Sequence, residues 1–176
     1  MEEGQRLLGE AVREILGLGL FPIVLGGGHE TTFGHFLGQL ADLEGEWEKP
    51  ELGIVNFDAH FDLRPYDSGS SSGSMFRHIA DICSEKQMNY HYMPLGIQRH
   101  SNTIQLFKTA REIGVDYILA KEIQPSNYAA VLEKVDTFLY PCSSAYITVC
   151  TDVFSSAFTP GVSATQYLGL DPETVL

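Results

Sequence analysis

One stretch of the sequence, residues 52–64, decides the expected fold and also indicates its chemistry. It reads Leu52-Gly53-Ile54-Val55-Asn56-Phe57-Asp58-Ala59-His60-Phe61-Asp62-Leu63-Arg64. Its first six residues are largely apolar and include the β-branched Ile54 and Val55, which is typical of a buried parallel strand. Asp58, His60 and Asp62 follow at spacings of two, and such residues point the same way in an extended segment. Because carboxylates with imidazole suit a hard or borderline divalent cation, the stretch predicts a metalloenzyme.

Length and composition narrow the class of protein. The 176 residues are enough for one domain with a substantial core, so we expect a single domain over 1–176. The net charge of -12 argues against nucleic acid or a membrane surface as a partner, because phosphates would be repelled. No apolar run is long enough for a membrane span. The odd number of cysteines (Cys83, Cys142 and Cys150) suits a reducing compartment and therefore the cytoplasm.

Apolar periodicity alternates along the chain between helix-like and strand-like segments. We expect strands at 21–25, 52–58, 92–97, 115–119 and 146–150, helices at 3–18, 30–40, 75–84, 101–113 and 125–138, and a polar linker at 42–51. Repeated βα alternation predicts an α/β fold, a parallel sheet covered by helices on both faces. Ligands in such folds bind beyond the carboxyl ends of the strands. A helix precedes the first strand and the last residues open another helix, so we expect the middle part of a larger fold.

Two further motifs fall at predicted strand ends. Gly26-Gly27-Gly28-His29-Glu30 lacks the spacing of a phosphate-binding loop, so we interpret its glycines as letting the backbone pass close to a site that His29 reaches. Cys150-Thr151-Asp152 follows the last strand and again presents two candidate ligands two residues apart. The alternative for the second motif is a buried cysteine and an aspartate that caps a turn.

Together the three motifs resemble those of the arginase/agmatinase/formimidoylglutamase family, the ureohydrolases. That family carries Gly-Gly-x-His, then Asp-Ala-His-x-Asp, then Asp-x-Asp before a Pro-Gly turn, and the order and separations match over residues 21–163. The resemblance implies an arginase-like three-layer α/β/α sandwich with a mainly parallel sheet, incomplete at both ends. It also implies a homo-oligomer and two divalent metal ions, usually Mn²⁺, bridged by hydroxide.

The resemblance assigns the site residues by motif. One ion would be held by His29, Asp58 and Asp62 and the other by His60 and Asp152, with Asp58 bridging the two. Asp62, with His60 among the catalytic residues, would carry a proton to the leaving amine.

Cys150 departs from the family pattern, because it stands where the second bridging aspartate is expected. A thiolate is softer than a carboxylate, so Zn²⁺, Fe²⁺ or Co²⁺ would be favoured over Mn²⁺. It would also make the site sensitive to oxidation.

Two arginines indicate the substrate. Arg64 after Asp62, and Arg77 after Phe76 (a histidine in arginases), resemble the formimidoylglutamase branch of the family. Guanidinium groups suit the carboxylates of a glutamate-derived amidine, whereas surface salt bridges are the alternative for both. The expected reaction is hydrolysis of N-formimidoyl-L-glutamate to L-glutamate and formamide, in histidine breakdown. The alternatives are another ureohydrolase of agmatinase, guanidinobutyrase or arginase type, or a catalytically silent metal-binding or assembly module.

Overall fold

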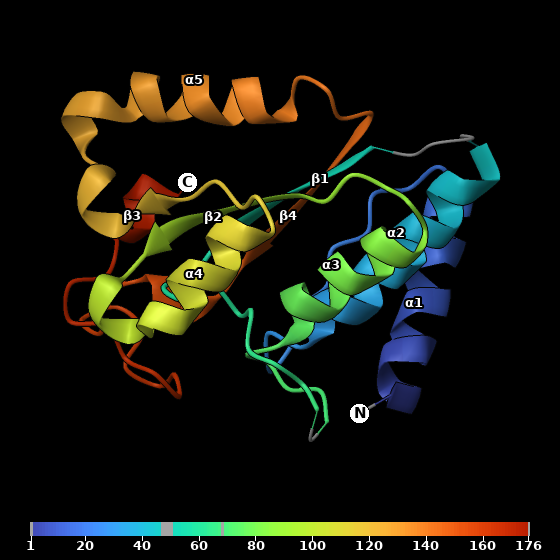
Figure 1. The fold of residues 1–176 in the computed structure, drawn as a ribbon, viewed down its shortest axis with the longest axis horizontal. Coiled ribbons are helices and arrows are strands. Elements are labelled where there is room, and N and C mark those ends of the chain that lie inside the picture. Colours follow the sequence, from blue (N-terminus) through green and yellow to red (C-terminus); the bar gives the residue numbers. More distant parts are fainter. Residues whose placement is uncertain (1, 47–50, 68, 176) are drawn as a thin grey trace. The chain divides into compact units, whose positions relative to one another are not determined.

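A four-stranded sheet is the framework on which the candidate ligands are placed. The computed structural model describes residues 2–46, 51–67 and 69–175. The strands are β1 (Leu52–Phe57), β2 (His91–Ile97), β3 (Ile118–Leu119) and β4 (Ser144–Val149), in the order β3-β2-β1-β4 (Figure 1). β1 pairs in parallel with β2, and β2 pairs in parallel with β3. The expected parallel sheet is therefore confirmed.

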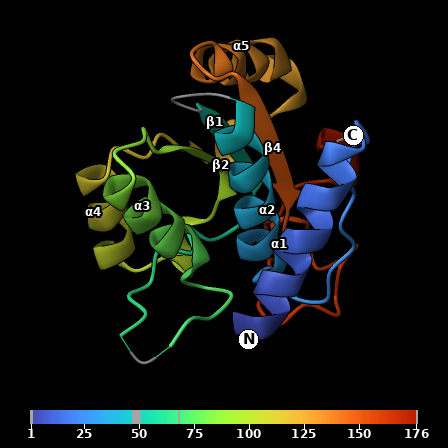
Figure 2. The same cartoon turned by 90° about the vertical axis from the view of Figure 1, so that its right-hand side faces the viewer.

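Helices α4 (Ile104–Glu112) and α5 (Tyr128–Leu139) lie on opposite faces of this sheet (Figures 1 and 2). On the α5 face, Val55, Met93 and Leu95 form a buried core against apolar residues of that helix. On the α4 face, the ring of Phe61 packs edge-on against Phe107 at 5.0 Å between ring centroids. Helices thus cover both faces of the sheet, which confirms the α/β/α arrangement.

The chain folds as two compact units. The sheet unit, residues 53–61 and 91–176, contains the sheet with α4 and α5, and the helical unit comprises residues 1–52 and 62–90. The helical unit contains α1 (Glu2–Gly17), α2 (Thr31–Glu46) and α3 (Met75–Glu85). The chain passes from one unit to the other between residues 52 and 53, 61 and 62, and 90 and 91.

Close contact between α1 and α2 holds the helical unit together (Figure 2). The amide of Gly34 in α2 donates a 2.7 Å hydrogen bond to the side-chain carbonyl oxygen of Gln5 in α1. Gly38 faces Gly9 and Val12 so closely that a Cβ atom at Gly38 would collide with the Gly9 carbonyl oxygen. Small residues therefore let the two helix backbones approach each other.

The predicted strand at 21–25 is wrong. These residues form no strand, and Phe21 and Leu25 are 85% and 95% exposed. The apolar composition of the segment suits a strand, but a strand also needs a neighbour for its backbone hydrogen bonds. None of the described strands provides that neighbour.

The other elements differ from expectation mainly at their ends. α2 continues to Glu46, into the predicted linker 42–51, of which residues 47–50 lie outside the described part of the chain. α4 begins only after Thr103, whose hydroxyl oxygen caps it by accepting a hydrogen bond from the Leu106 amide. β3 has two residues instead of five, and the first turn of the predicted helix at 125–138 is a 3₁₀ turn, Pro125–Asn127. Among the described helices, none combines the length and apolar character of a membrane span.

Candidate metal centre

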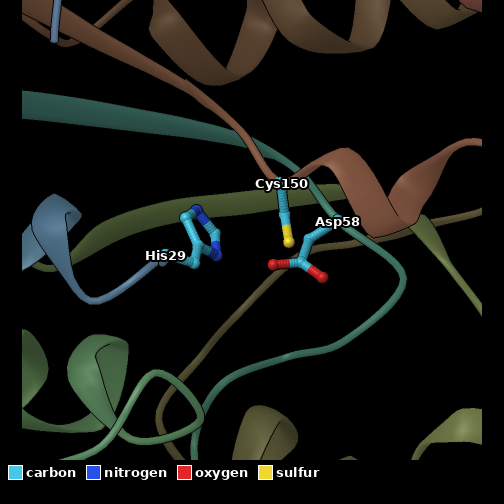
Figure 3. Close-up of side chains that lie close together, drawn as sticks. All are labelled: His29, Asp58 and Cys150. Carbon is cyan, nitrogen blue, oxygen red and sulfur yellow. The ribbon is translucent and has the colours of Figure 1, made fainter. Parts of the chain in front are cut away.

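The ends of β1 and β4 bring two of the sequence motifs together in the sheet unit. The amide of Cys150 donates a 2.9 Å hydrogen bond to the carbonyl oxygen of Phe57, so the residues that follow the two strands start side by side. Figure 3 shows the Cys150 thiol and the Asp58 carboxylate pointing toward each other. The motifs that contain Asp58 and Asp152 therefore meet at one edge of the sheet, as parallel topology predicts.

Asp58, His60 and Asp152 form a cluster whose ligand atoms all lie within 4.8 Å of one another. His60 Nδ1 is 3.0 Å from Asp152 Oδ2 and 3.4 Å from Asp58 Oδ1. Asp58 is fully buried, and Asp152 is only 7% exposed. Two carboxylates and an imidazole in a largely buried position are a donor set for a divalent cation.

One oxygen of this cluster has no hydrogen-bond partner among the described residues. Asp152 Oδ2 faces His60, but the buried Asp152 Oδ1 accepts no hydrogen bond. A buried carboxylate oxygen without a partner costs free energy unless a cation or donor reaches it. The orphaned oxygen therefore supports a metal ion at this position.

The loop after β1 does not arrange its ligands by strand alternation, which corrects the geometric part of the prediction. β1 ends at Phe57, and the next residues bend. The His60 amide donates a 2.8 Å hydrogen bond to Asp58 Oδ1, an aspartate turn that folds His60 back over the carboxylate. Asp58 and His60 thus converge because the chain turns.

A single buried amide, that of Asn102, fixes the shape of this loop. Its Oδ1 accepts a 3.0 Å hydrogen bond from the Phe61 amide, and its Nδ2 donates to the carbonyl oxygens of Ala59 and Gln98, both at 2.8 Å. Nothing in the sequence pattern singled out Asn102. Its role depends on the loop conformation, which periodicity does not specify.

Gly96 near the end of β2 leaves room for the same loop. It has a positive φ of 100°, and a Cβ atom there would meet Val153 and, at 3.3 Å, the carbonyl oxygen of Asp58. A larger residue would be strained in this conformation and would push against the cluster.

Two neighbouring carboxylates set the protonation of His60. Burial disfavours the charged imidazole, but hydrogen bonds and charges from Asp152 and Asp58 outweigh it and raise the pKa of His60 to about 10. Without a metal ion, a proton therefore occupies the position between His60 and the carboxylates. A cation that binds there must displace that proton.

The helical unit carries two other predicted ligands as a pair. His29 Nδ1 lies 3.2 Å from Asp62 Oδ2, and both side chains are largely buried. The ring of Phe76 packs edge-on against His29, with centroids 5.7 Å apart. Asp62 has a positive φ of 49°, a conformation that is uncommon outside glycine and that aspartate tolerates better than most residues.

The two predicted substrate-binding arginines differ in their surroundings. Arg77 forms an ion pair with Asp81 one turn along α3, with 3.4 Å between Nε and Oδ1. Arg64 is exposed, its amide donates to the carbonyl oxygen of Gly73, and its guanidinium packs so closely on Gly73 that a Cβ atom there would lie 3.2 Å from Nε. Arg64 is thus the more accessible of the two.

His78, which is half-buried, and His35, which is buried, have local roles. The ring of His78 stacks between Phe33 and Tyr66, at centroid distances of 4.4 and 4.6 Å. His35 is buried in α2, and this burial lowers its pKa below the usual 6.5. His35 and His60 are both shielded from water, but their pKa values move in opposite directions because carboxylates hydrogen-bond to His60.

A parallel sheet flanked by helices, with carboxylates and imidazole after its strand ends, defines the class of α/β metal-binding proteins. Within that class the chain belongs to the arginase family, whose family model matches residues 2–176. It is 55% identical over 177 residues to a formimidoylglutamase of Clostridium tetani, covering 100% of this chain and 52% of the relative. It is 45% identical to a formimidoylglutamase of Geobacillus thermodenitrificans, covering 98% of this chain and 51% of the relative. The chain therefore spans about half the length of these relatives.

Solved structures confirm the fold. A formimidoylglutamase of Bacillus subtilis superposes with a TM-score of 0.83 at 20% identity, over 99% of this chain and 53% of that chain. A formiminoglutamase of Trypanosoma cruzi, solved with Mn²⁺, superposes with a TM-score of 0.85 at 23% identity, over 99% of this chain and 56% of that chain. The arginase-like α/β fold expected from the sequence is correct.

Proposed function

We propose that this chain provides the metal-binding part of a hydrolase that converts N-formimidoyl-L-glutamate and water into L-glutamate and formamide. The observation that carries the proposal is the cluster of Asp58, His60 and Asp152 at the ends of neighbouring strands. The 55% identity to a formimidoylglutamase over the whole chain supports the choice of substrate.

The donor set supports a binuclear centre of two divalent ions. The cluster in the sheet unit offers oxygen and nitrogen ligands and an orphaned buried oxygen on Asp152. We propose that His29 and Asp62 complete the centre. Asp62 is four residues from Asp58, so the chain keeps their Cα atoms within roughly 14 Å whatever the conformation. Mn²⁺ is the ion expected from the family resemblance, and Cys150 favours Zn²⁺, Fe²⁺ or Co²⁺.

The chain's own residues would divide the chemistry among them. Divalent ions bound here would supply Lewis acidity and a water of lowered pKa that attacks the amidine carbon. Asp58, His60 and Asp152 would fix this position from the sheet. Asp62 would accept the proton of the attacking water and pass it to the leaving amine nitrogen. His29 Nδ1, at 3.2 Å from Asp62 Oδ2, would hold that carboxylate in place until a metal ion binds.

Arginine side chains would bind the carboxylates of the substrate. Arg64 is exposed and held on Gly73, so its guanidinium can meet a carboxylate of a glutamate-derived amidine. Arg77 would have to leave its ion pair with Asp81 to do the same. We therefore assign the larger share of substrate binding to Arg64.

Cysteine usage, chain length and charge support proposals on localisation, domain organisation and partners. None of the three cysteines forms a disulfide, which suits the cytoplasm. We also propose a single domain over 1–176, a homo-oligomer, and no nucleic-acid or membrane partner.

Turnover and metal content, measured together, test this function. The purified chain is loaded with Mn²⁺, Zn²⁺ or Co²⁺ and assayed on formimidoylglutamate, arginine, agmatine and guanidinobutyrate. We expect two bound ions and turnover of formimidoylglutamate, lost in Asp62→Asn and retained in the control Asp136→Asn, an exposed carboxylate of α5. Hydrolysis of agmatine alone would point to another ureohydrolase. Bound metal without turnover would favour the silent metal-binding module.

A further inference from the structure

Cys150 differs from the other two cysteines in its surroundings. It is the first residue after β4 and precedes the 3₁₀ turn Thr151–Val153, so its backbone is fixed by the sheet on one side and the turn on the other. Its sulfur lies within 4.8 Å of an Asp58 carboxylate oxygen and points toward it (Figure 3). Ligands of one tetrahedral ion lie roughly 3–4 Å apart, given Zn–S and Zn–O bonds of about 2.3 and 2.0 Å. The separation of the Cys150 sulfur from the Asp58 oxygen is therefore close to the spacing of two ligands on one ion.

A second observation comes from the same turn. Asp152, two residues after Cys150, has a buried Oδ1 without a hydrogen-bond partner among the described residues. The Val153 amide donates a 3.1 Å hydrogen bond to the Cys150 carbonyl oxygen, which closes the turn between the two candidate ligands. The thiol and the orphaned carboxylate oxygen thus belong to one hydrogen-bonded turn next to Asp58.

The other cysteines show what a structural cysteine looks like in this chain. Burial raises the pKa of the Cys83 thiol to about 11, so Cys83 stays protonated. The Cys142 sulfur lies 3.9 Å from the carbonyl oxygen of Phe138, at the end of α5. Neither belongs to a group of candidate metal ligands among the described residues.

We propose that Cys150 binds the metal centre as a thiolate and so shifts its preference from Mn²⁺ toward a thiophilic ion such as Zn²⁺, Fe²⁺ or Co²⁺. Binding replaces the thiol proton with the metal: the S–H bond breaks, a sulfur–metal bond forms, and one proton is released. A thiolate carries the same charge as the carboxylate it replaces, so the preference follows from softness rather than charge. This inference rests on the metal binding in the proposed function, but not on turnover or on the substrate.

Cobalt provides a readout that is independent of activity. The reduced 176-residue chain is titrated with Co²⁺ without oxygen, and the near-ultraviolet spectrum is recorded for thiolate-to-cobalt charge transfer. We expect this band in the parent chain and in the matched control Cys142→Ser. We expect none in Cys150→Asp, which should still bind Co²⁺, and there the affinity for Mn²⁺ relative to Zn²⁺ should rise about tenfold or more.

The remaining outcomes separate the two proposals. Co²⁺ bound by the parent chain without the band, or a band that persists in Cys150→Asp, would refute thiolate ligation and leave the hydrolase proposal standing. A band without turnover of formimidoylglutamate would support thiolate ligation and count against the hydrolase. Failure of folded parent chain to bind any of the metals would refute both. Circular dichroism of each variant identifies loss of fold.

Discussion

The sheet unit and the helical unit hold their candidate ligands in different ways. In the sheet unit, Asp58 and His60 follow β1 and Asp152 follows β4, and a hydrogen bond joins the ends of these two strands. Buried polar groups fix the loop that follows β1. In the helical unit, His29 and Asp62 lie on loops: His29 follows a largely exposed segment, and Asp62 itself has a left-handed backbone conformation. The neighbouring ends of β1 and β4 bring Asp58 and Asp152 together, and a hydrogen-bonded turn adds His60. His29 and Asp62 instead depend on the side chains that pack around them.

The largest effect is expected from a substitution in the sheet-unit cluster. Asp58→Asn should weaken binding of Zn²⁺ or Co²⁺ by more than about 100-fold, because loss of groups that merely orient ligands already costs 10–100-fold. Asp62→Asn in the helical unit should weaken binding less and act mainly on turnover. Isothermal titration calorimetry of both variants measures the difference. Equal losses of affinity would mean that Asp58 and Asp62 contribute equally to metal binding.

A change in substrate binding would show what the helical unit adds. Arg64→Ala should raise KM for formimidoylglutamate about tenfold to a hundredfold, since a charge-assisted hydrogen bond to a carboxylate contributes about 1.5–3 kcal/mol. Metal affinity should not change. Arg77→Ala is the matched control and should raise KM less, because Arg77 already forms an ion pair with Asp81. A larger KM effect at Arg77 would reverse the assignment.

Weakening the α1–α2 contact inside the helical unit tests whether the two units unfold together. Gly38→Ala should destabilise the protein by about 1–3 kcal/mol, because the new methyl group meets the backbone of Gly9. Gly4→Ala, with no atom near the new methyl group, should stabilise by up to about 1 kcal/mol. Thermal unfolding followed by circular dichroism should show one transition shifted as a whole in each variant. Two separate transitions would contradict a single domain.

The smallest expected effect concerns acid. Burial lowers the pKa of His35, so the unfolded chain binds more protons than the folded one below about pH 6.5, and stability is lost as the pH falls through that range. The slope is at most about 1.4 kcal/mol per pH unit. His35→Gln should flatten the dependence of unfolding free energy on pH between 7 and 5. His100→Gln, at an exposed position, is the control variant.

Much of the fold could be predicted from the sequence, because periodicity reports directly on burial. The apolar run at 52–57 and the amphipathic pattern of α1 both correspond to observed elements. The strand predicted at 21–25 has an equally apolar composition but no partner strand among the described residues. Composition shows what a segment could bury, but not whether anything is present to cover it.

The sequence predicted that the residues after β1 and β4 come together, but not the geometry in which they do so. Parallel topology requires that the motifs after β1 and β4 meet, and they do. The turn that folds His60 over Asp58 depends on side-chain hydrogen bonds that leave no periodic signal. For the same reason Asn102 and Gly96 could not be anticipated, although both shape the loop.

The buried amide of Asn102 has a consequence for how fast a metal ion can bind. With the Phe61 amide bonded to Asn102, this backbone hydrogen should exchange with solvent far more slowly than is usual for a loop. A loop that keeps its shape before the ion arrives requires no ordering step during binding. The association rate should then be set by diffusion and by departure of the proton between His60 and its carboxylates, rather than by rearrangement of the chain.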